Sequence, residues 1–286
     1  MPASRLPSAR SPHKTSSRFR RVTSLGATLV AALWTSAYVH AAVPADWWVS
    51  VTNDRPQYIQ QSLAKGVDPN AKTPDGQPAV MQAIRDGSWK VYDVLVAHPK
   101  FDPNVENKFG ETPLMYLAVL GEAQRGQALI KKGAQVNRLG WTPLQYAASK
   151  GQLEMAKMLL ANQAIVNAPG PEGTTALMMA ALSGNQQMVQ LLLDAGADVT
   201  MQTTQKETAA AWARKRDYES LARKLDDLDQ KVLAQRKQMR SIPGQAVPEP
   251  AMVLPPEDPA QDTQKSNSAA ASSNGTSRYF DLKRFD

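Results

Sequence analysis

The sequence predicts an all-α solenoid of about six helix-turn-helix units with short finger loops, followed by a disordered C-terminal tail. Three observations lead to this prediction. A segment of about 33 residues recurs along the chain, each copy holds two apolar-periodic stretches, and glycine and proline recur at fixed positions within it. The 286 residues include no cysteine. A packed core rather than disulfide bonds must therefore hold the fold together.

The repeat is clearest in three segments, GETPLMYLAVLG, GWTPLQYAASKG and GTTALMMAALSG, which begin at Gly110, Gly140 and Gly173. Gly76 begins a related copy 34 residues before Gly110, and Lys206 continues the frame 33 residues after Gly173. One helix pair cannot bury its apolar face alone, so self-similarity at this period predicts stacked units.

The first helix of each unit is predicted from a threonine followed by a proline. Thr112 and Thr142 precede Pro113 and Pro143. The threonine hydroxyl is a favoured N-cap acceptor, and the fixed φ of proline suits the first helical position. Gly151 is expected to end the helix that begins at Pro143.

A second apolar-periodic stretch, such as QLEMAKMLLAN, brings the chain back in each unit. Asn70, Asn104 and Asn167 follow this stretch in their units and begin the loop to the next one. Helix, turn, helix and loop therefore repeat in order.

These residues resemble the ankyrin repeat over roughly residues 46–230. The resemblance implies a repeat domain over residues 43–240. Its expected parts are a degenerate first unit at about 46–75, units at about 76–109, 110–139, 140–172 and 173–205, and a C-terminal cap at 206–240. Within the cap, Leu221, Leu225 and Leu228 predict a long helix packed on the last unit, or the seam of a short coiled coil.

The sequence departs from the family pattern at two features. The histidine that often follows TPL is replaced by Met115, Gln145 and Met178, so we expect a capping hydrogen bond to be missing and the stability to be lower. The loop between Asn137 and Gly140 is three residues short, which predicts a tight turn there.

Residues 1–42 have the pattern of a secretory signal peptide. An arginine-rich start precedes the apolar stretch LGATLVAALWTSAYV and the small residues of VHAAVP. The expected protein is exported to the bacterial periplasm, with cleavage near Ala41 or Ala42. An uncleaved anchor in the inner membrane, facing the periplasm, and a twin-arginine signal at Arg20 and Arg21 are the alternatives.

The positive net charge of +7 belongs to this leader. It holds six of the 33 basic residues and no acidic one, which leaves 27 basic against 26 acidic residues. We therefore expect no nucleic-acid partner, and a membrane contact only if the leader is not removed.

Catalytic chemistry has few candidate residues. His98 is the single histidine after residue 42, so cysteine–histidine dyads and multi-histidine metal sites are excluded there. We expect no catalytic residue, metal or cofactor. The alternative is an enzyme, or a binder of cell-wall or small-molecule ligands, that uses Glu111 and Glu172 in a concave groove.

The ankyrin resemblance implies that the chain binds another protein through a concave face made of the finger loops and the exposed side of each first helix. A scaffold, chaperone or inhibitor and immunity-type binder all fit this role. Carried over position by position, the expected contacts are Phe109, Glu111, Val119, Leu120, Trp141, Ser149, Lys150, Thr174 and Leu182. Phe109, Leu120, Trp141 and Leu182 are expected to form an apolar patch.

The chain after residue 240 has the composition of a linker, rich in Pro, Ser and Ala over residues 241–277. Residues 278–286, RYFDLKRFD, differ from it sharply. Their apolar side chains are Tyr279, Phe280, Leu282 and Phe285. We expect this motif to dock in cis on the ankyrin face or to recruit a partner in trans, the alternative being a solvated tail.

Overall fold

The computed structural model describes residues 42–240. The predicted signal peptide, apart from Ala42, lies outside these residues, as do the predicted linker 241–277 and the motif 278–286. The expectations for those segments therefore remain predictions.

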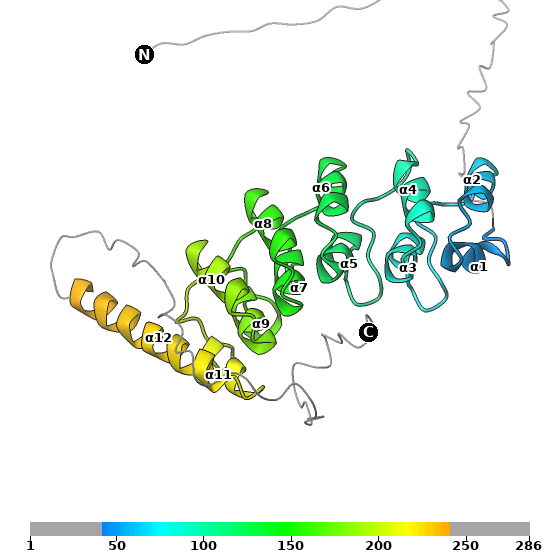
Figure 1. Cartoon of the computed structure of the whole chain (residues 1–286). Helices are drawn as coiled ribbons and strands as arrows, with labels where there is room; N and C mark the ends of the chain where they lie inside the picture. The colour runs from blue at the N-terminus through cyan, green and yellow to red at the C-terminus, as the bar shows by residue number, and fades with distance from the viewer. Residues whose placement is uncertain (1–41, 241–286) are drawn as a thin grey trace, which may run out of the picture. The chain divides into compact units, whose positions relative to one another are not determined.

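Residues 42–240 form twelve α-helices, one short 3-10 helix and no strand, in six helix pairs (Figure 1). The helices are α1 (Trp47–Thr52), α2 (Pro56–Ala64), α3 (Ala79–Arg85), α4 (Trp89–Ala97), α5 (Pro113–Leu120), α6 (Ala123–Lys131), α7 (Pro143–Ser149), α8 (Leu153–Ala161), α9 (Ala176–Ser183), α10 (Gln186–Asp194), α11 (Ala209–Arg214) and α12 (Glu219–Arg240), with the 3-10 helix η1 at Pro171–Gly173. The predicted all-α solenoid of six helix-turn-helix units is confirmed.

The first helices of the pairs, here called the inner helices, stack in chain order from α1 to α11. An inner helix in the middle of the stack has neighbours on both sides and its own outer helix behind it. In α5 every residue from Pro113 to Val119 is buried as a result. Met115 and Met178 belong to the core, at 0% and 1% exposure. The core is therefore one continuous layer along the stack.

The helix starts agree only in part with the predicted caps. The Thr142 hydroxyl accepts from the backbone N–H of Gln145, as expected, but the Thr112 side chain makes no such bond. The expected loss of a hydrogen bond at Gln145 is wrong. Its Nε2 donates to the carbonyls of Ala168 (3.1 Å) and Thr174 (2.9 Å), and its Oε1 accepts from Thr142 N (2.8 Å). An amide thus supplies both a donor and an acceptor at this turn.

An asparagine ladder joins consecutive units. In each step the side-chain nitrogen donates to a carbonyl in the loop after the next outer helix, and the side-chain oxygen accepts from a backbone N–H two residues later. For Asn104 these partners are Gly133 O (2.9 Å) and Gln135 N (2.8 Å). The ladder residues are Asn70, Asn104, Asn137 and Asn167. The ladder therefore fixes the spacing of neighbouring units.

We expect Asn104→Ala to lower the free energy of unfolding by about 1–2 kcal/mol, because two inter-unit hydrogen bonds are lost at a half-buried loop. Asn53→Ala is the matched control, since the Asn53 side chain bonds only to Val49 O within its own helix end. Urea unfolding measures both. Equal losses in the two variants would contradict a special role for the ladder.

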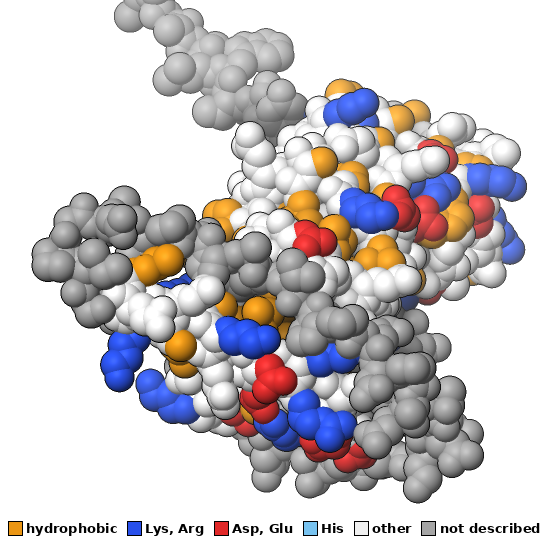
Figure 2. Space-filling view, turned by 60° about the vertical axis from the view of Figure 1, so that its left-hand side comes forward, with side chains coloured by type: hydrophobic (Ala, Val, Ile, Leu, Met, Phe, Trp, Pro, Cys, Tyr) orange, Lys and Arg blue, Asp and Glu red, His pale blue; other side chains and the backbone are white. Residues whose placement is uncertain are grey.

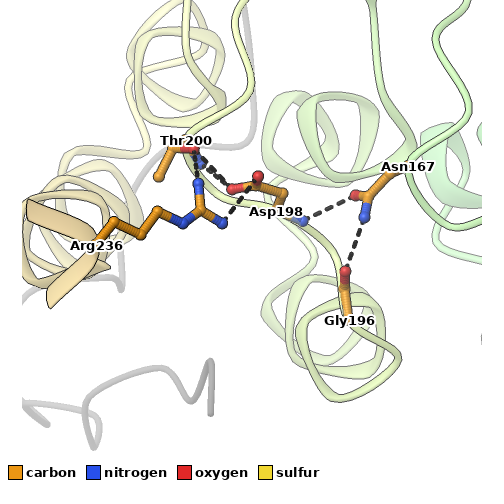
Figure 3. Close-up of polar contacts among 5 residues, drawn as sticks. All are labelled: Asn167, Gly196, Asp198, Thr200 and Arg236. Carbon is orange, nitrogen blue, oxygen red and sulfur yellow. Dashed lines mark hydrogen bonds and ion pairs between the residues drawn. The ribbon is translucent and has the colours of Figure 1, made fainter. Parts of the chain in front are cut away.

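The ladder ends on the terminal helix α12 (Figure 3). Thr200, after α10 in the fifth unit, stands where earlier units have asparagine, and Arg236 donates to Thr200 Oγ1 (2.8 Å) and to Asp198 Oδ2 (3.0 Å). Asp198 in turn donates its backbone N–H to Asn167 (2.8 Å). An arginine from α12, the outer helix of the sixth pair, therefore takes the place of the loop that the next regular unit would supply at this end.

The apolar side of α12 packs on the solenoid rather than forming a coiled-coil seam. Leu221, Leu225, Leu228 and Val232 are all buried, at 2%, 0%, 7% and 1% exposure. At the other end Trp47 is fully buried and meets Trp48 edge to face, with ring centroids 6.5 Å apart. Both ends of the core are thus covered by large apolar side chains from atypical units.

Asp229 on α12 has an unfavourable position near this end. Burial raises the pKa of its carboxyl, and the charges of Asp226 and Asp198 raise it further against the lowering effect of Arg236. Its Oδ1 is buried without a hydrogen-bond partner in the described chain. The pKa of Asp229 is higher in the folded chain than the ordinary value of 3.8. The free energy of unfolding therefore falls as the pH rises from below 3.8 through the raised pKa, because the folded state must then hold an unfavourable charge.

We therefore expect Asp229→Asn to raise the free energy of unfolding at neutral pH, by at most about 1 kcal/mol because the group is partly solvated. The gain should shrink as the pH falls to about 3.5, where the carboxyl is protonated in the folded wild type. Chemical unfolding at both pH values measures it. A gain of the same size at both would contradict the electrostatic explanation.

Candidate protein-binding face

Finger loops connect each outer helix to the next inner helix. At the base of a finger the backbone pairs with itself across four residues, as in Asn107 N to Glu111 O (3.1 Å) and Thr203 N to Glu207 O (3.0 Å). Each finger has at least one residue with a positive φ near its tip, such as Gly110 at 72° and, in the last unit, Lys206 at 64°. Lys206 thus occupies the turn position that the repeat period predicts, with a left-handed backbone although it is not a glycine.

Two neighbouring fingers present large apolar side chains to solvent. Phe109 is 52% exposed and Leu139 is 98% exposed. The Phe109 backbone N–H donates to Asn107 Oδ1 (2.9 Å), which fixes the loop, and Lys108 Nζ lies 5.2 Å from the Phe109 ring centroid. We call Phe109 and Leu139 the fingertip pair. Leu139 lies in the shortened loop, so that truncation exposes a leucine almost completely.

Three expected contact residues are instead buried. Glu111, Trp141 and Thr174 are 1%, 8% and 0% exposed. All three occupy one register position, directly before the threonine that precedes the inner helix. This position lies at the base of the finger. The backbone carbonyls of Glu111 and Thr174 accept hydrogen bonds there from the N–H groups four residues earlier, of Asn107 and Gly170. Trp141 meets the ring of Tyr146 edge to face at 6.3 Å between centroids. Their assignment to an exposed surface is therefore wrong.

Val119 and Ser149 are also buried, at 3% and 9% exposure. They lie on inner helices that neighbours cover on both sides, and the Ser149 hydroxyl donates to Tyr146 O (2.7 Å). Of the expected contacts on the inner helices or at their ends, only three remain half-buried, and they lie one or two residues before a turn glycine: Leu120, Lys150 and Leu182, which we call the turn residues. The predicted apolar patch thus loses Trp141, and the finger face consists of the fingertip pair and the turn residues.

A buried polar network lies beneath the finger face. Glu111 accepts from the Tyr146 hydroxyl through Oε1 (2.6 Å) and from Asn107 Nδ2 through Oε2 (2.7 Å). Gln77 Nε2 donates to the Tyr116 hydroxyl (3.1 Å). These bonds connect three successive units. Sequence reasoning missed them, although a tyrosine at the same place in TPLMY and TPLQY, within an apolar helix, was a usable signal.

This geometry bears on the predicted carboxylate site. Glu111 cannot reach a bound substrate, because it is 1% exposed and both its oxygens accept hydrogen bonds inside the solenoid. Glu172 belongs to another finger, at η1, with a φ of 58°. Within residues 42–240 no group of three or more His, Cys, Asp or Glu side chains is placed to hold a metal ion. Glu111 and Glu172 therefore do not form the predicted pair of acids in the groove.

The surface carries no large area of one charge sign on the face seen in Figure 2, where basic and acidic side chains are interspersed with hydrophobic ones. Some of the surface charges form ion pairs, for example Arg138 with Glu106 (2.5 Å) between neighbouring fingers. In the described part of the chain no helix combines the length and apolarity that a bilayer span requires. The residues that make up the finger face, Phe109, Leu139, Leu120, Leu182 and Lys150, offer mainly apolar contact with a single charge.

Comparison with known proteins identifies the family. A family model described as ankyrin repeats (3 copies) matches residues 48–139, 80–169, 123–203 and 165–234. The chain belongs to the ankyrin-repeat family. Its ankyrin segment is 30% identical over 143 residues to the ankyrin repeat and SAM domain-containing protein 6 of Rattus norvegicus, covering 50% of this chain and 13% of that protein. It is 32% identical over 141 residues to the E3 ubiquitin-protein ligase XBAT33 of Arabidopsis thaliana, covering 49% and 27%.

The ankyrin match therefore concerns a module rather than a whole protein. The chain spans less than a third of the length of these two relatives. Ankyrin repeats form a protein–protein interaction module, which is the coarse function of this chain. The predicted ankyrin resemblance is confirmed.

Proposed function

We propose that this ankyrin-repeat protein is a non-enzymatic, exported binding protein of the bacterial envelope, acting as a scaffold, chaperone or inhibitor for another protein through its finger face. The exposure of Phe109 and Leu139 on neighbouring fingers carries the proposal. Large apolar side chains exposed side by side on a rigid stack favour a partner that covers them.

The size of the effect is sufficient for recognition. Burying one large apolar side chain contributes about 1.5–3 kcal/mol, so the fingertip pair together provides a central anchor for a complex. Lys150 belongs to the finger face, and Lys108 lies beside Phe109. Their charges serve to orient an approaching partner more than to raise the affinity. The inner helix α5, which follows the Phe109 finger, is buried from Pro113 to Val119 and holds the anchor in place.

The envelope location is supported by the leader pattern and by the lack of cysteine in a chain expected to enter an oxidising compartment. Mass measurement of the N-terminus of the exported protein tests it. We expect a chain that starts at or near Ala42 or Val43. A protein that retains Met1 and sediments with membranes would indicate the uncleaved anchor.

The binding face is tested by the double variant Phe109→Asp, Leu139→Asp. Ile165→Asp is the matched control, because Ile165 is 57% exposed but lies at the start of the loop after α8, before the hairpin closed by Gly170 N and Thr174 O that forms the finger itself. Quantitative affinity capture from the envelope fraction should lose the specific partners at least about tenfold in the double variant and keep them in the control. Equal recovery with all three proteins would overturn the proposed face.

A further inference from the structure

We propose that residues 278–286 of this chain bind its own finger face in cis and compete there with the external partner. In this proposal a segment of the same chain occupies the face that the proposed function assigns to a partner protein. Only the competition with that partner rests on the proposed function. The occupant is RYFDLKRFD, and the site is the fingertip pair with Lys108 beside it.

The chemistry of the two sides matches. All three aromatic residues beyond residue 240 fall within this motif, namely Tyr279, Phe280 and Phe285. Neighbouring units of a solenoid lie about 10 Å apart, and three residues of extended chain cover about the same distance. Alternate residues of an extended chain share one face, so Phe280 and Leu282 can meet Phe109 and Leu139 together, with the length of the side chains covering the remaining distance. Asp281 between them offers a carboxylate to the long side chain of Lys108.

The intervening chain is long enough. From Arg240, α12 runs back about 33 Å to its start, and two or three units separate that start from the fingertip pair, about 20–30 Å more. The 37 residues of 241–277 have a root-mean-square span of roughly 30–35 Å and a fully extended length of about 120 Å. The path is therefore shorter than the extended linker.

Tethering makes a weak interaction sufficient. A flexible linker of this kind gives an effective concentration on the order of 1 mM, somewhat less for a long span. A motif that binds with a Kd of about 100 µM as a free peptide would then occupy the face about nine-tenths of the time. An external partner would meet a reduction of about tenfold in its apparent affinity.

Hydrogen exchange on the full chain tests the proposal without any external partner. The test variant replaces Tyr279, Phe280, Leu282 and Phe285 by Ser. Its matched control replaces four apolar residues of the linker, Val247, Met252, Val253 and Leu254, by Ser. We expect exchange at the finger amides of residues 108–110 and 139–141 to be about tenfold faster in the test variant and unchanged in the control.

Each outcome decides between alternatives. Finger exchange that is identical in wild type and test variant overturns the proposal. Protection that increases with protein concentration overturns it as well, in favour of binding to a second copy. Loss of protection in Phe109→Asp, Leu139→Asp as in the test variant places the motif on the fingertip pair. Partner capture by the finger face is measured separately, so failure of the cis contact leaves the proposed function standing.

Discussion

Replacing Glu111 by alanine is expected to lower the free energy of unfolding by about 3 kcal/mol, the largest effect of any single substitution considered for this protein. The carboxylate is buried and accepts from the Tyr146 hydroxyl and Asn107 Nδ2. Its removal leaves two buried donors without this acceptor and opens a cavity between two units. Urea unfolding followed by circular dichroism measures the loss.

Glu106→Ala is the matched control on the same finger. The Glu106 carboxylate is 48% exposed and pairs with Arg138 at the surface, so its loss should cost no more than about 1 kcal/mol. A double-mutant cycle of Glu111→Ala with Tyr146→Phe isolates the inter-unit bond. Equal destabilisation by the two alanine variants would show that burial of Glu111 has no special weight.

Replacing Gly184 by alanine should cost about 2–3 kcal/mol. Gly184 ends α9 with a φ of 72°, and a Cβ built there would lie 2.7 Å from Cε1 of Tyr218 and closer still to two other ring atoms. The left-handed backbone alone costs a side chain about 1 kcal/mol. The remainder comes from displacing the Tyr218 ring, which lies just before α12 and contacts the end of α9 at Gly184.

Gly140→Ala separates the two contributions. Gly140 has a similar φ of 82°, but nothing lies within 4 Å of a Cβ there. It should therefore lose only about 1 kcal/mol. Adding Tyr218→Ala to Gly184→Ala should make the penalty of the glycine substitution fall to the same value. If Gly140→Ala and Gly184→Ala are equally destabilising, contact with Tyr218 is not the cause.

The solenoid itself was predictable because its signals are local and repeated. Threonine and proline mark the start of α5 and α7, and the turn glycines have the positive φ that their position in the repeat demands. Even the frame at Lys206, without glycine, holds a left-handed turn in the structure. Such features depend on a few neighbouring residues, so a sequence can display them.

The candidate site was predicted less well, for a reason of register. Glu111, Trp141 and Thr174 stand next to a fingertip glycine in the chain, yet their side chains lie under the finger at 8% exposure or less. A single residue separates the tip from the base. Phe109, two residues before Glu111, is 52% exposed. Whether Phe109 or Glu111 faces solvent depends on packing against the next unit, for example on the bond from Tyr146 to Glu111. That contact joins residues far apart in the sequence.

The sequence by itself determined the helical repeat, the number of units and the absence of cysteine chemistry, because periodicity and composition follow directly from the chain. Only the tertiary structure decided which polar groups are buried and which apolar ones are exposed. The Glu111–Tyr146 bond joins residues 35 positions apart, and the two bonds of Arg236 at the end of the asparagine ladder join residues 36 and 38 positions apart. Such bonds exist only once units stack, and the stacking also leaves Leu139 uncovered at the fingertip.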